Sequence, residues 1–323
     1  MPCYHPLAVY HDGNRIVFHN PTSMSSIGLN KQFNIPCGQC IGCRLNYARE
    51  WAIRCMHESE YYSRFLSKPS CFITLTFNNH YFKKFGKNLN KKIFQDFMKR
   101  LRMAYPGEDI RYFHSGEYGE TNTKRPHYHA LIFGVDFSDD PDRRKYNNPK
   151  NKKLQLYLSQ KLTTLKDKNK FNSPVIGGLW KYGFSVIGNV SFESASYTAR
   201  YITKKLTGKQ KQEYPPYATM SRGKRDNNQG GLGYRWLKQY HKDVYNNDYV
   251  VMRGGFKSKP PRYYDKIYEA EINEKKFKEI KKHRIDNTYE CATTLEHNKQ
   301  LEKKEKYKLV QFQKLIRKLD KST

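Results

Sequence analysis

Two histidines one residue apart, His127 and His129, open the apolar stretch of KRPHYHALIFG at residues 124–134. The stretch has the pattern of a β-strand that enters a core, and successive side chains of a strand point to opposite faces. The two imidazoles therefore share one face, about 6–7 Å apart along the chain. A single buried histidine is usually satisfied by hydrogen bonds, whereas a same-face pair beside a source of carboxylates favours a metal site.

The preceding segment, DIRYFHSGEYG at residues 109–119, supplies that carboxylate. It has the pattern of a strand that ends in turn residues, and it can pair antiparallel with residues 127–134. This pairing brings Glu117 opposite the histidines; Glu117 is preferred to Glu120, which falls in the loop, and His114 is a further candidate. Two imidazoles and one carboxylate leave positions open for water or a phosphate oxygen. Imidazole favours Mn²⁺ or Zn²⁺, but an open site can also use Mg²⁺ when substrate phosphate completes it.

A second reactive group lies in ESASYTARYITKKL at residues 193–206, which has helical spacing. Tyr197 and Tyr201 are four residues apart and so share a helical face, and Lys204 and Lys205 fall on or near that face. The same spacing also suits an ordinary aromatic face that packs on a sheet. Beside a metal, however, a phenol can attack a phosphate from which the metal draws charge, and an ammonium can stabilise the charges that develop.

Attack by a tyrosine on DNA would leave a phosphotyrosine link to one DNA end and a free hydroxyl on the other. The link conserves the phosphodiester for later rejoining, because covalent catalysis divides one transfer into two steps. Two tyrosines permit two successive transfers without dissociation.

Four segments in order, between about residues 36 and 206, carry a resemblance to a known family: PCGQCIGCRLNYAREWAIRCMHE, SGEYGE, RPHYHALIFG and YTARYITKK. Together they resemble the HUH endonuclease superfamily, and within it the rolling-circle replication initiators of microviruses, the gokushovirus-like single-stranded DNA bacteriophages. The resemblance implies a metal-dependent, tyrosine-nucleophile DNA nickase and strand transferase, with a divalent metal (Mg or Mn) at the histidine pair. It implies single-stranded DNA, the replication origin and the host replication helicase and polymerase as partners, in the cytoplasm of a bacterial host.

A third group, Cys37, Cys40 and Cys43, has C-x2-C-x2-C spacing. Thiolates this close usually bind one metal together with a fourth ligand from elsewhere. Cys3 is the expected fourth ligand, because Cys55 falls on the apolar stripe of the following helix. Zn²⁺ is preferred to an iron–sulfur cluster, since the fourth cysteine of a ferredoxin run is missing. We expect a structural zinc that fixes the N-terminus; the alternative is three reduced thiols packed near a helix start.

The elements that must position these groups follow from periodicity. Two adjacent strands in the middle of the order favour an antiparallel sheet, with helices on one face. The predicted fold class is α+β, an HUH endonuclease-like antiparallel sheet flanked by helices, with an N-terminal Cys-cluster segment and a charged helical C-terminal tail. The predicted strands are 71–77, 109–119, 127–134 and 184–192, and the predicted helices are one from near Arg44, 91–105 and 193–206.

Changes in composition suggest three parts. Residues 1–70 would hold the cysteine cluster and a long helix packed on the nuclease core. Residues 71–262 would be the nuclease domain, with a Lys/Asn-rich insertion near 136–172 that contains a short helix near 154–165. Residues 263–323 would be the charged helical tail.

The net charge of the chain indicates a polyanion, such as a nucleic acid, as its binding partner. The net charge is +30, from 60 Lys and Arg against 30 Asp and Glu, and such a potential attracts polyanions. Aromatic residues make up 15%, which suits base stacking. Basic segments at 99–102, 201–211 and 253–264 are candidates for a DNA track. No apolar run approaches 18 residues, so we expect no membrane partner, and without an export signal we expect reduced cysteines.

Three other functions were compared with the nickase. A transposase or relaxase of the same chemistry is the nearest alternative, and a non-catalytic zinc-bearing nucleic-acid-binding protein is the second. Only the catalytic readings need Tyr197 or Tyr201. A zinc deaminase is rejected, because no His-x-Glu precedes PCGQC.

Overall fold

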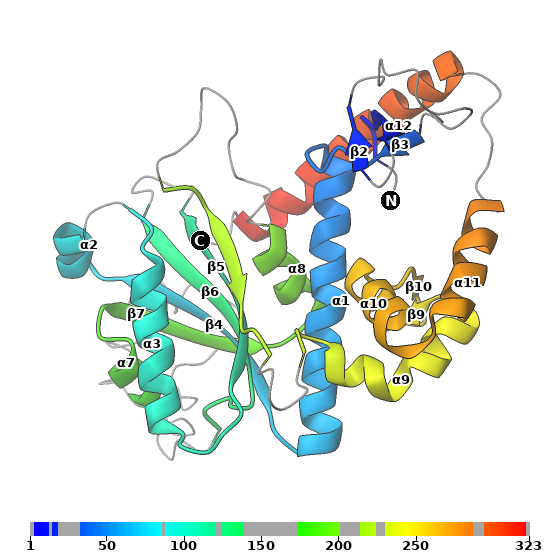
Figure 1. Ribbon diagram of the computed structural model, residues 1–323. Helices are drawn as coiled ribbons and strands as arrows, with labels where there is room; N and C mark the ends of the chain where they lie inside the picture. The colour runs from blue at the N-terminus through cyan, green and yellow to red at the C-terminus, as the bar shows by residue number, and fades with distance from the viewer. Residues whose placement is uncertain are drawn as a thin grey trace. The chain divides into compact units, whose positions relative to one another are not determined.

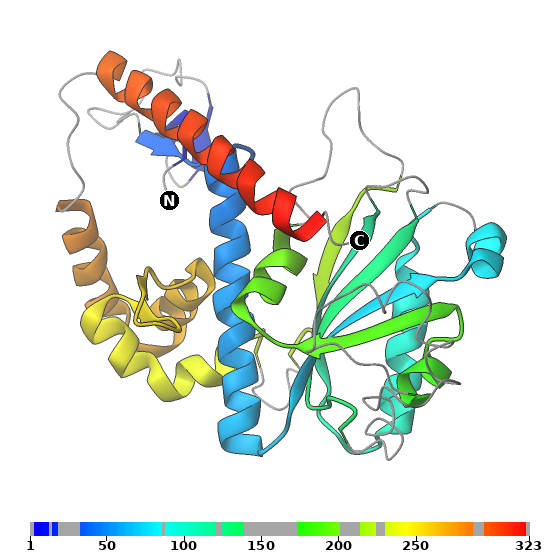
Figure 2. The same ribbon diagram turned by 180° about the vertical axis from the view of Figure 1, so that it is seen from behind.

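The computed structural model describes nine stretches of the chain, which form two compact units. One unit comprises Met1–Tyr47 and Thr288–Lys321, and the other comprises Ala48–Asn287 and Ser322–Thr323. Figure 1 and Figure 2 show the elements from opposite sides. The described residues are 3–12, 15–18, 33–85, 88–119, 125–138, 174–200, 214–223, 230–286 and 294–320.

The larger unit is built on a five-stranded antiparallel sheet with the order β7-β4-β6-β5-β8. Strands β5 and β6 pair as the sequence predicts, and the α+β fold class is confirmed. Strand β8 comes from a region that periodicity left unassigned. The strands are β4 (Ser70–Phe77), β5 (Arg111–Tyr118), β6 (Pro126–Phe133), β7 (Gly183–Asn189) and β8 (Tyr217–Met220).

One face of the sheet packs on helix α3 (Lys91–Ala104) and on α7 (Pro174–Leu179). Helix α3 begins at Asn90, whose side chain accepts a hydrogen bond from the amide of Lys92. Its apolar stripe, which includes Phe94, Phe97 and Leu101, is buried against the sheet. Helix α2 (Asn79–Phe85) follows β4 directly.

The opposite face is covered by helix α1 (Ile41–Leu66) and helix α8 (Phe192–Arg200). Alanines at the contact, among them Ala52 and Ala195, let the helices approach Leu131 of β6 closely. The expectation of helices on one face is therefore wrong, because β6 is buried on both sides. Figure 1 and Figure 2 agree on this layering, with α3 on one side of the sheet and α1 and α8 on the other.

The same unit continues into a group of short elements whose core is rich in tyrosine. Its buried residues include Tyr245, Tyr264 and Tyr268, together with Ile53 of α1. The elements are α9 (Tyr234–Asn247), β9 (Val250–Val251), β10 (Lys257–Ser258), α10 (Arg262–Ile267), a π-helical turn η3 (Tyr268–Ile272) and α11 (Glu274–Asp286).

The smaller unit combines both ends of the chain. A three-stranded sheet of order β2-β1-β3 precedes α1, and a helix of 27 residues, α12 (Thr294–Asp320), makes up the tail. Residues 139–173 lie outside the described residues, and with them most of the insertion and its helix near 154–165. Among the described residues, no helix has the length and apolar character needed to cross a membrane. The strands are β1 (Leu7–Asp12), β2 (Arg15–Val17) and β3 (Phe33–Ile35).

Candidate active site and cysteine cluster

The register of β5 and β6 brings the histidine pair and its expected carboxylate together. His127 lies directly opposite Glu117, and His129 lies opposite Ser115 in the next row. Residues paired in this way share a face, and here it is the face covered by α1 and α8. The ring centroids of the two histidines are 6.4 Å apart, and His129 Nε2 lies 2.7 Å from Glu117 Oε1. Glu117 and His129 are buried, while His127 is half-buried and accessible.

Two threonines of β4 contact the histidine rings; β4 pairs with the edge of β6 that is opposite β5. Thr74 Oγ1 lies 2.9 Å from His129 Nδ1, and Thr76 Oγ1 lies 3.0 Å from His127 Nδ1. A hydroxyl can donate or accept, so it satisfies either tautomer of the ring. Nδ1 of each ring faces a threonine of β4, and Nε2 faces the β5 side, at Glu117 for His129 and at Gly119 for His127. Hydrogen bonding of the second ring nitrogen is the usual support of a metal-binding histidine.

Helix α8 delivers Tyr197 to this cluster. The Tyr197 hydroxyl donates to Glu117 Oε1 over 3.4 Å, and its ring lies edge-on to His129 with centroids 5.2 Å apart. The start of the helix is fixed by reciprocal bonds, from the Ser194 amide to Ser191 Oγ and from the Ser191 amide to Ser194 Oγ. The phenol therefore projects from a capped helix, not from a loop.

Two further residues shape the surroundings of the histidines: a glycine that leaves space and a serine that adds a buried hydroxyl. Gly119 follows β5, and an ideal Cβ built on it would lie 2.9 Å from His127 Nε2, so only glycine avoids a clash with the ring. Ser115 Oγ is buried beside His129 and has no hydrogen-bond partner within the described part of the chain. A buried hydroxyl without a partner is costly unless a ligand or water satisfies it.

His114, the further candidate on β5, lies on the opposite face. It stacks on Phe94 of α3 with ring centroids 3.6 Å apart, and its Nδ1 is 2.7 Å from Thr219 Oγ1. Burial lowers the pKa of His114 well below its usual 6.5, so it is a neutral core residue. Four other predicted site residues lie outside the described residues: Glu120, Tyr201, Lys204 and Lys205.

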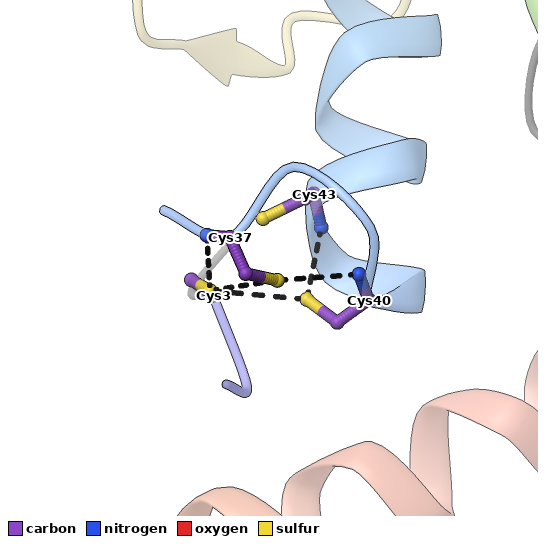
Figure 3. Close-up of side chains that lie close together, drawn as sticks. All are labelled: Cys3, Cys37, Cys40 and Cys43. Atoms are coloured by element: carbon purple, nitrogen blue, oxygen red, sulfur yellow. Dashed lines mark hydrogen bonds between the residues drawn. The ribbon is translucent and has the colours of Figure 1, made fainter. Parts of the chain in front are cut away.

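The four cysteines expected to bind a metal also meet. The sulfurs of Cys3, Cys37, Cys40 and Cys43 all lie within 4.8 Å of one another. Cys3 comes from the segment before β1, Cys37 and Cys40 from the turn before α1, and Cys43 from the first turn of α1, as Figure 3 shows. Cys55, which the sequence assigns to the apolar stripe of the helix, lies on α1 and is buried in the core between α1 and the sheet.

Comparisons with known proteins identify the family. A family model described as replication-associated protein ORF2/G2P matches residues 70–206. The replication-associated protein VP4 of Bdellovibrio phage phiMH2K is 33% identical over 253 residues, covering 75% of this chain and 70% of the relative. This chain belongs to the family of phage replication-associated proteins.

Two more relatives of this replication-associated protein carry similar descriptions. The replication-associated protein ORF2 of Spiroplasma virus 4 is 28% identical over 291 residues, 84% of this chain and 81% of the relative. The replication-associated protein ORF4 of Chlamydia phage 1 is 22% identical over 250 residues, 76% of this chain and 56% of the relative. No solved structure matches.

The matched region of the replication-associated protein runs from β4 to just beyond α8 and so contains the whole histidine–tyrosine site. Sequence reasoning missed several residues of this site. The threonine pair has the same two-residue spacing as the histidines, but only the pairing of β4 with β6 reveals its role. Arg200, one turn after Tyr197, places its guanidinium 6.0 Å from the tyrosine ring centroid.

Proposed function

We propose that this replication-associated protein initiates rolling-circle replication by nicking single-stranded or origin DNA through a 5′-phosphotyrosine intermediate and later rejoining the ends. One observation carries the proposal: the Tyr197 hydroxyl lies 3.4 Å from a Glu117 oxygen that is itself 2.7 Å from His129 Nε2. A phenol, a carboxylate and an imidazole from three separate elements converge on one face of the sheet. If Tyr197 only packed on the sheet as a core residue, its hydroxyl would not need a carboxylate and an imidazole beside it.

We further propose a divalent cation, Mg²⁺ or Mn²⁺, at His127, His129 and Glu117. The residues fit such an ion: both imidazoles are held at Nδ1, and a buried carboxylate faces His129. Gly119 places no side chain against His127 Nε2, which an added Cβ would approach to 2.9 Å. When bound, the ion would withdraw charge from the scissile phosphate.

The side chains have distinct roles in this proposal. The Tyr197 oxygen attacks phosphorus, so the bond from phosphorus to the 3′ oxygen breaks while the bond to the phenol forms. The phenol loses its proton, and the departing 3′ oxygen gains one. Arg200 contributes positive charge near the phosphate, as would Lys204 and Lys205, and Tyr201 is the second nucleophile for rejoining.

Phe184 offers an exposed aromatic ring on which a base of the proposed DNA substrate can stack. It lies opposite Thr76 on β7, in the same row as His127 and on the same face, and 42% of it is exposed. Neighbouring strands are about 4.8 Å apart, so Phe184 lies about two strand spacings from His127. An exposed aromatic at this separation can stack on a nucleotide base next to the scissile phosphate.

The test is formation of a covalent adduct. The protein is incubated with Mn²⁺ or Mg²⁺ and labelled single-stranded origin DNA, and a protease-sensitive protein–DNA band is expected. Tyr197→Phe should reduce the adduct strongly, and the double change with Tyr201→Phe should abolish it. Tyr307→Phe, which alters an exposed tyrosine of α12, is the matched control and should leave the adduct unchanged.

An unchanged adduct in the double variant would exclude this helix as the source of the nucleophile. DNA binding without any adduct in the wild-type protein would favour the non-catalytic zinc-bearing alternative. Adduct formation on DNA without the origin sequence would favour a transposase or relaxase.

A further inference from the structure

We propose that Cys3, Cys37, Cys40 and Cys43 bind one Zn²⁺ as four thiolates, and that this ion holds α12 and the N-terminal segment together as one folded unit. This inference is independent of the nicking reaction. It concerns the smaller unit, whereas the histidine–tyrosine site lies in the larger one.

The sulfur positions match a single tetrahedral ion. Zinc–sulfur bonds are about 2.3 Å, so tetrahedral geometry separates the sulfurs by roughly 3.8 Å. Cys3 Sγ lies 3.5 Å from Cys37 Sγ and 3.9 Å from Cys40 Sγ. A [4Fe–4S] cluster would hold the thiolates farther apart, because each thiolate would bind a different iron. Four sulfur ligands around one ion are typical of structural zinc.

Backbone amides surround the sulfurs in a way that favours thiolates. The amides of Cys37, Cys40 and Tyr4 donate to sulfurs at 3.2–3.3 Å, and the amide of Cys43 donates to Cys40 Sγ at 3.5 Å. Amide donors to ligating atoms are the expected second layer of a metal site, since they orient the ligands and offset their negative charge. Figure 3 shows the contacts among the four cysteines around the start of α1.

The cysteine cluster is also part of the buried core of the smaller unit. The fully buried residues of this core are Tyr4, Cys40 and Leu301, with the other cysteines packed around them. Leu301 is the one buried residue among the described side chains of α12. A second contact, between His5 Nε2 and Glu305 at 2.6 Å, joins the same two segments at the surface.

Such a core is too small to fold by apolar burial alone. The sheet consists of strands of six, three and three residues, and α12 is rich in Lys and Glu. Small units of this kind usually need a metal or disulfides, and zinc binding to thiolates then supplies the folding free energy. Removal of the ion should therefore release α12.

The first experiment measures metal content. The full-length protein is purified under reducing conditions with His127→Ala and His129→Ala, so that the histidine pair cannot bind metal. We expect one zinc per chain by mass spectrometry. Cys40→Ser should weaken zinc binding at least tenfold in competition with a chromophoric chelator, while Cys71→Ser, which changes a cysteine of β4 in the larger unit, should not. Less than a tenth of an equivalent, or equal binding by both variants, would overturn the site.

The second experiment tests the link to α12 without relying on a variant. Zinc is removed from the same protein with a chelator, and hydrogen exchange is followed by peptide. Amides of 294–320 should exchange at least tenfold faster, whereas β4 to β6 should keep their protection. Unchanged protection of α12 after complete zinc loss would overturn the structural role. Neither readout depends on DNA cleavage, so failure here and failure of the tyrosine adduct are separate results.

Discussion

Gly119 occupies a position where even one methyl group would touch the site. Its amide is fixed by a 2.9 Å hydrogen bond to the carbonyl of Arg125, so the backbone cannot retreat easily. An added Cβ would lie 2.9 Å from His127 Nε2 and would compete with any ligand of that nitrogen.

Gly119→Ala is therefore expected to raise the Mn²⁺ concentration needed for half-maximal adduct formation by about tenfold or more, the range seen when ligand support is disturbed. A metal titration of adduct yield measures this shift. Gly178→Ala is the control, because an added Cβ there meets no atom within 4 Å. Equal metal requirements in both variants would argue against His127 as a ligand.

Phe184 should matter for binding the strand, not for the reaction itself. Phe184→Ala removes one stacking contact worth about 1–3 kcal/mol, so KM for single-stranded DNA should rise roughly 5- to 150-fold with kcat little changed. Phe184→Trp should restore KM, and Phe256→Ala, which alters another exposed aromatic, should have no effect. A fall in kcat alone would assign Phe184 a different role.

Some residues of the candidate active site could be predicted from the sequence, and others could not. His127 and His129 follow from a period of two, and Glu117 follows from the pairing of consecutive strands. Thr74 was missed, because local periodicity does not tell that β4 flanks β6. Ser115 lies on the predicted partner strand, but a serine alone gives no signal of a metal site. Side chains alternate along a strand, and His114 is three residues from Glu117. It therefore lies on the face opposite Glu117 and the histidine pair, and was a misleading candidate.

At the scale of elements, a buried ion pair joins α1 to the sheet and to α9. Glu58 accepts from Arg111 Nη1 at 2.8 Å and from the Gly233 amide at 2.7 Å. Both charged side chains are almost fully buried. Removing one partner of such a pair leaves a buried charge without compensation.

Glu58→Gln should therefore lower the free energy of unfolding by about 3–5 kcal/mol. Replacing both partners with apolar residues, as in Glu58→Met with Arg111→Met, should cost less than the single change. Urea denaturation measures both. Glu108→Gln, which breaks the exposed pair with Lys68, is the control and should cost about 1 kcal/mol or less.

The elements that escaped prediction share a physical cause. Helix α1 begins before the predicted start near Arg44, because the turn of the cysteine cluster already closes the bond from the Arg44 amide to the Cys40 carbonyl. Helix α9 was not predicted, because its buried side chains include Tyr234, Trp236 and Tyr245 and do not stand out from the Tyr-rich segment around them. Helix α11 lies within residues 263–323, which were predicted as helical. The strands β4 to β6 were predictable because they are long and their apolar residues are β-branched or aromatic.

For the whole molecule, two buried histidines make stability depend on pH. Burial lowers the pKa of His57 to about 3 and that of His114 well below 6.5. The folded protein therefore excludes protons that the unfolded chain binds below about pH 6.5. Stability from these groups is complete above that pH and is lost as the pH falls.

Each of these histidines should reduce the free energy of unfolding by up to about 1.4 kcal/mol per pH unit below pH 6.5. Urea denaturation between pH 7 and pH 5 measures the slope. His57→Phe keeps the stacking on Trp236, where the ring centroids are now 3.5 Å apart, and should make the slope shallower. A slope identical to that of the wild type would contradict the prediction.

The charge of +30 should make DNA binding strongly dependent on salt. For single strands the log–log slope is about −0.7 for each phosphate neutralised. Arg200→Gln should reduce its magnitude by about 0.7, as measured by fluorescence anisotropy. Lys99→Gln should not, because the basic segment 99–102 lies on α3, which covers the face opposite the histidines. Affinity independent of salt would exclude an electrostatic track.

The smaller unit also affects how the protein is made. Its cysteines are synthesised well before Leu301 and the rest of α12. The larger unit can fold in between, but the smaller one must wait for α12. A ribosome that stops early, or a cut before residue 288, would leave the cysteine turn without its helical cover, so intact α12 marks a chain that has been translated through residue 320.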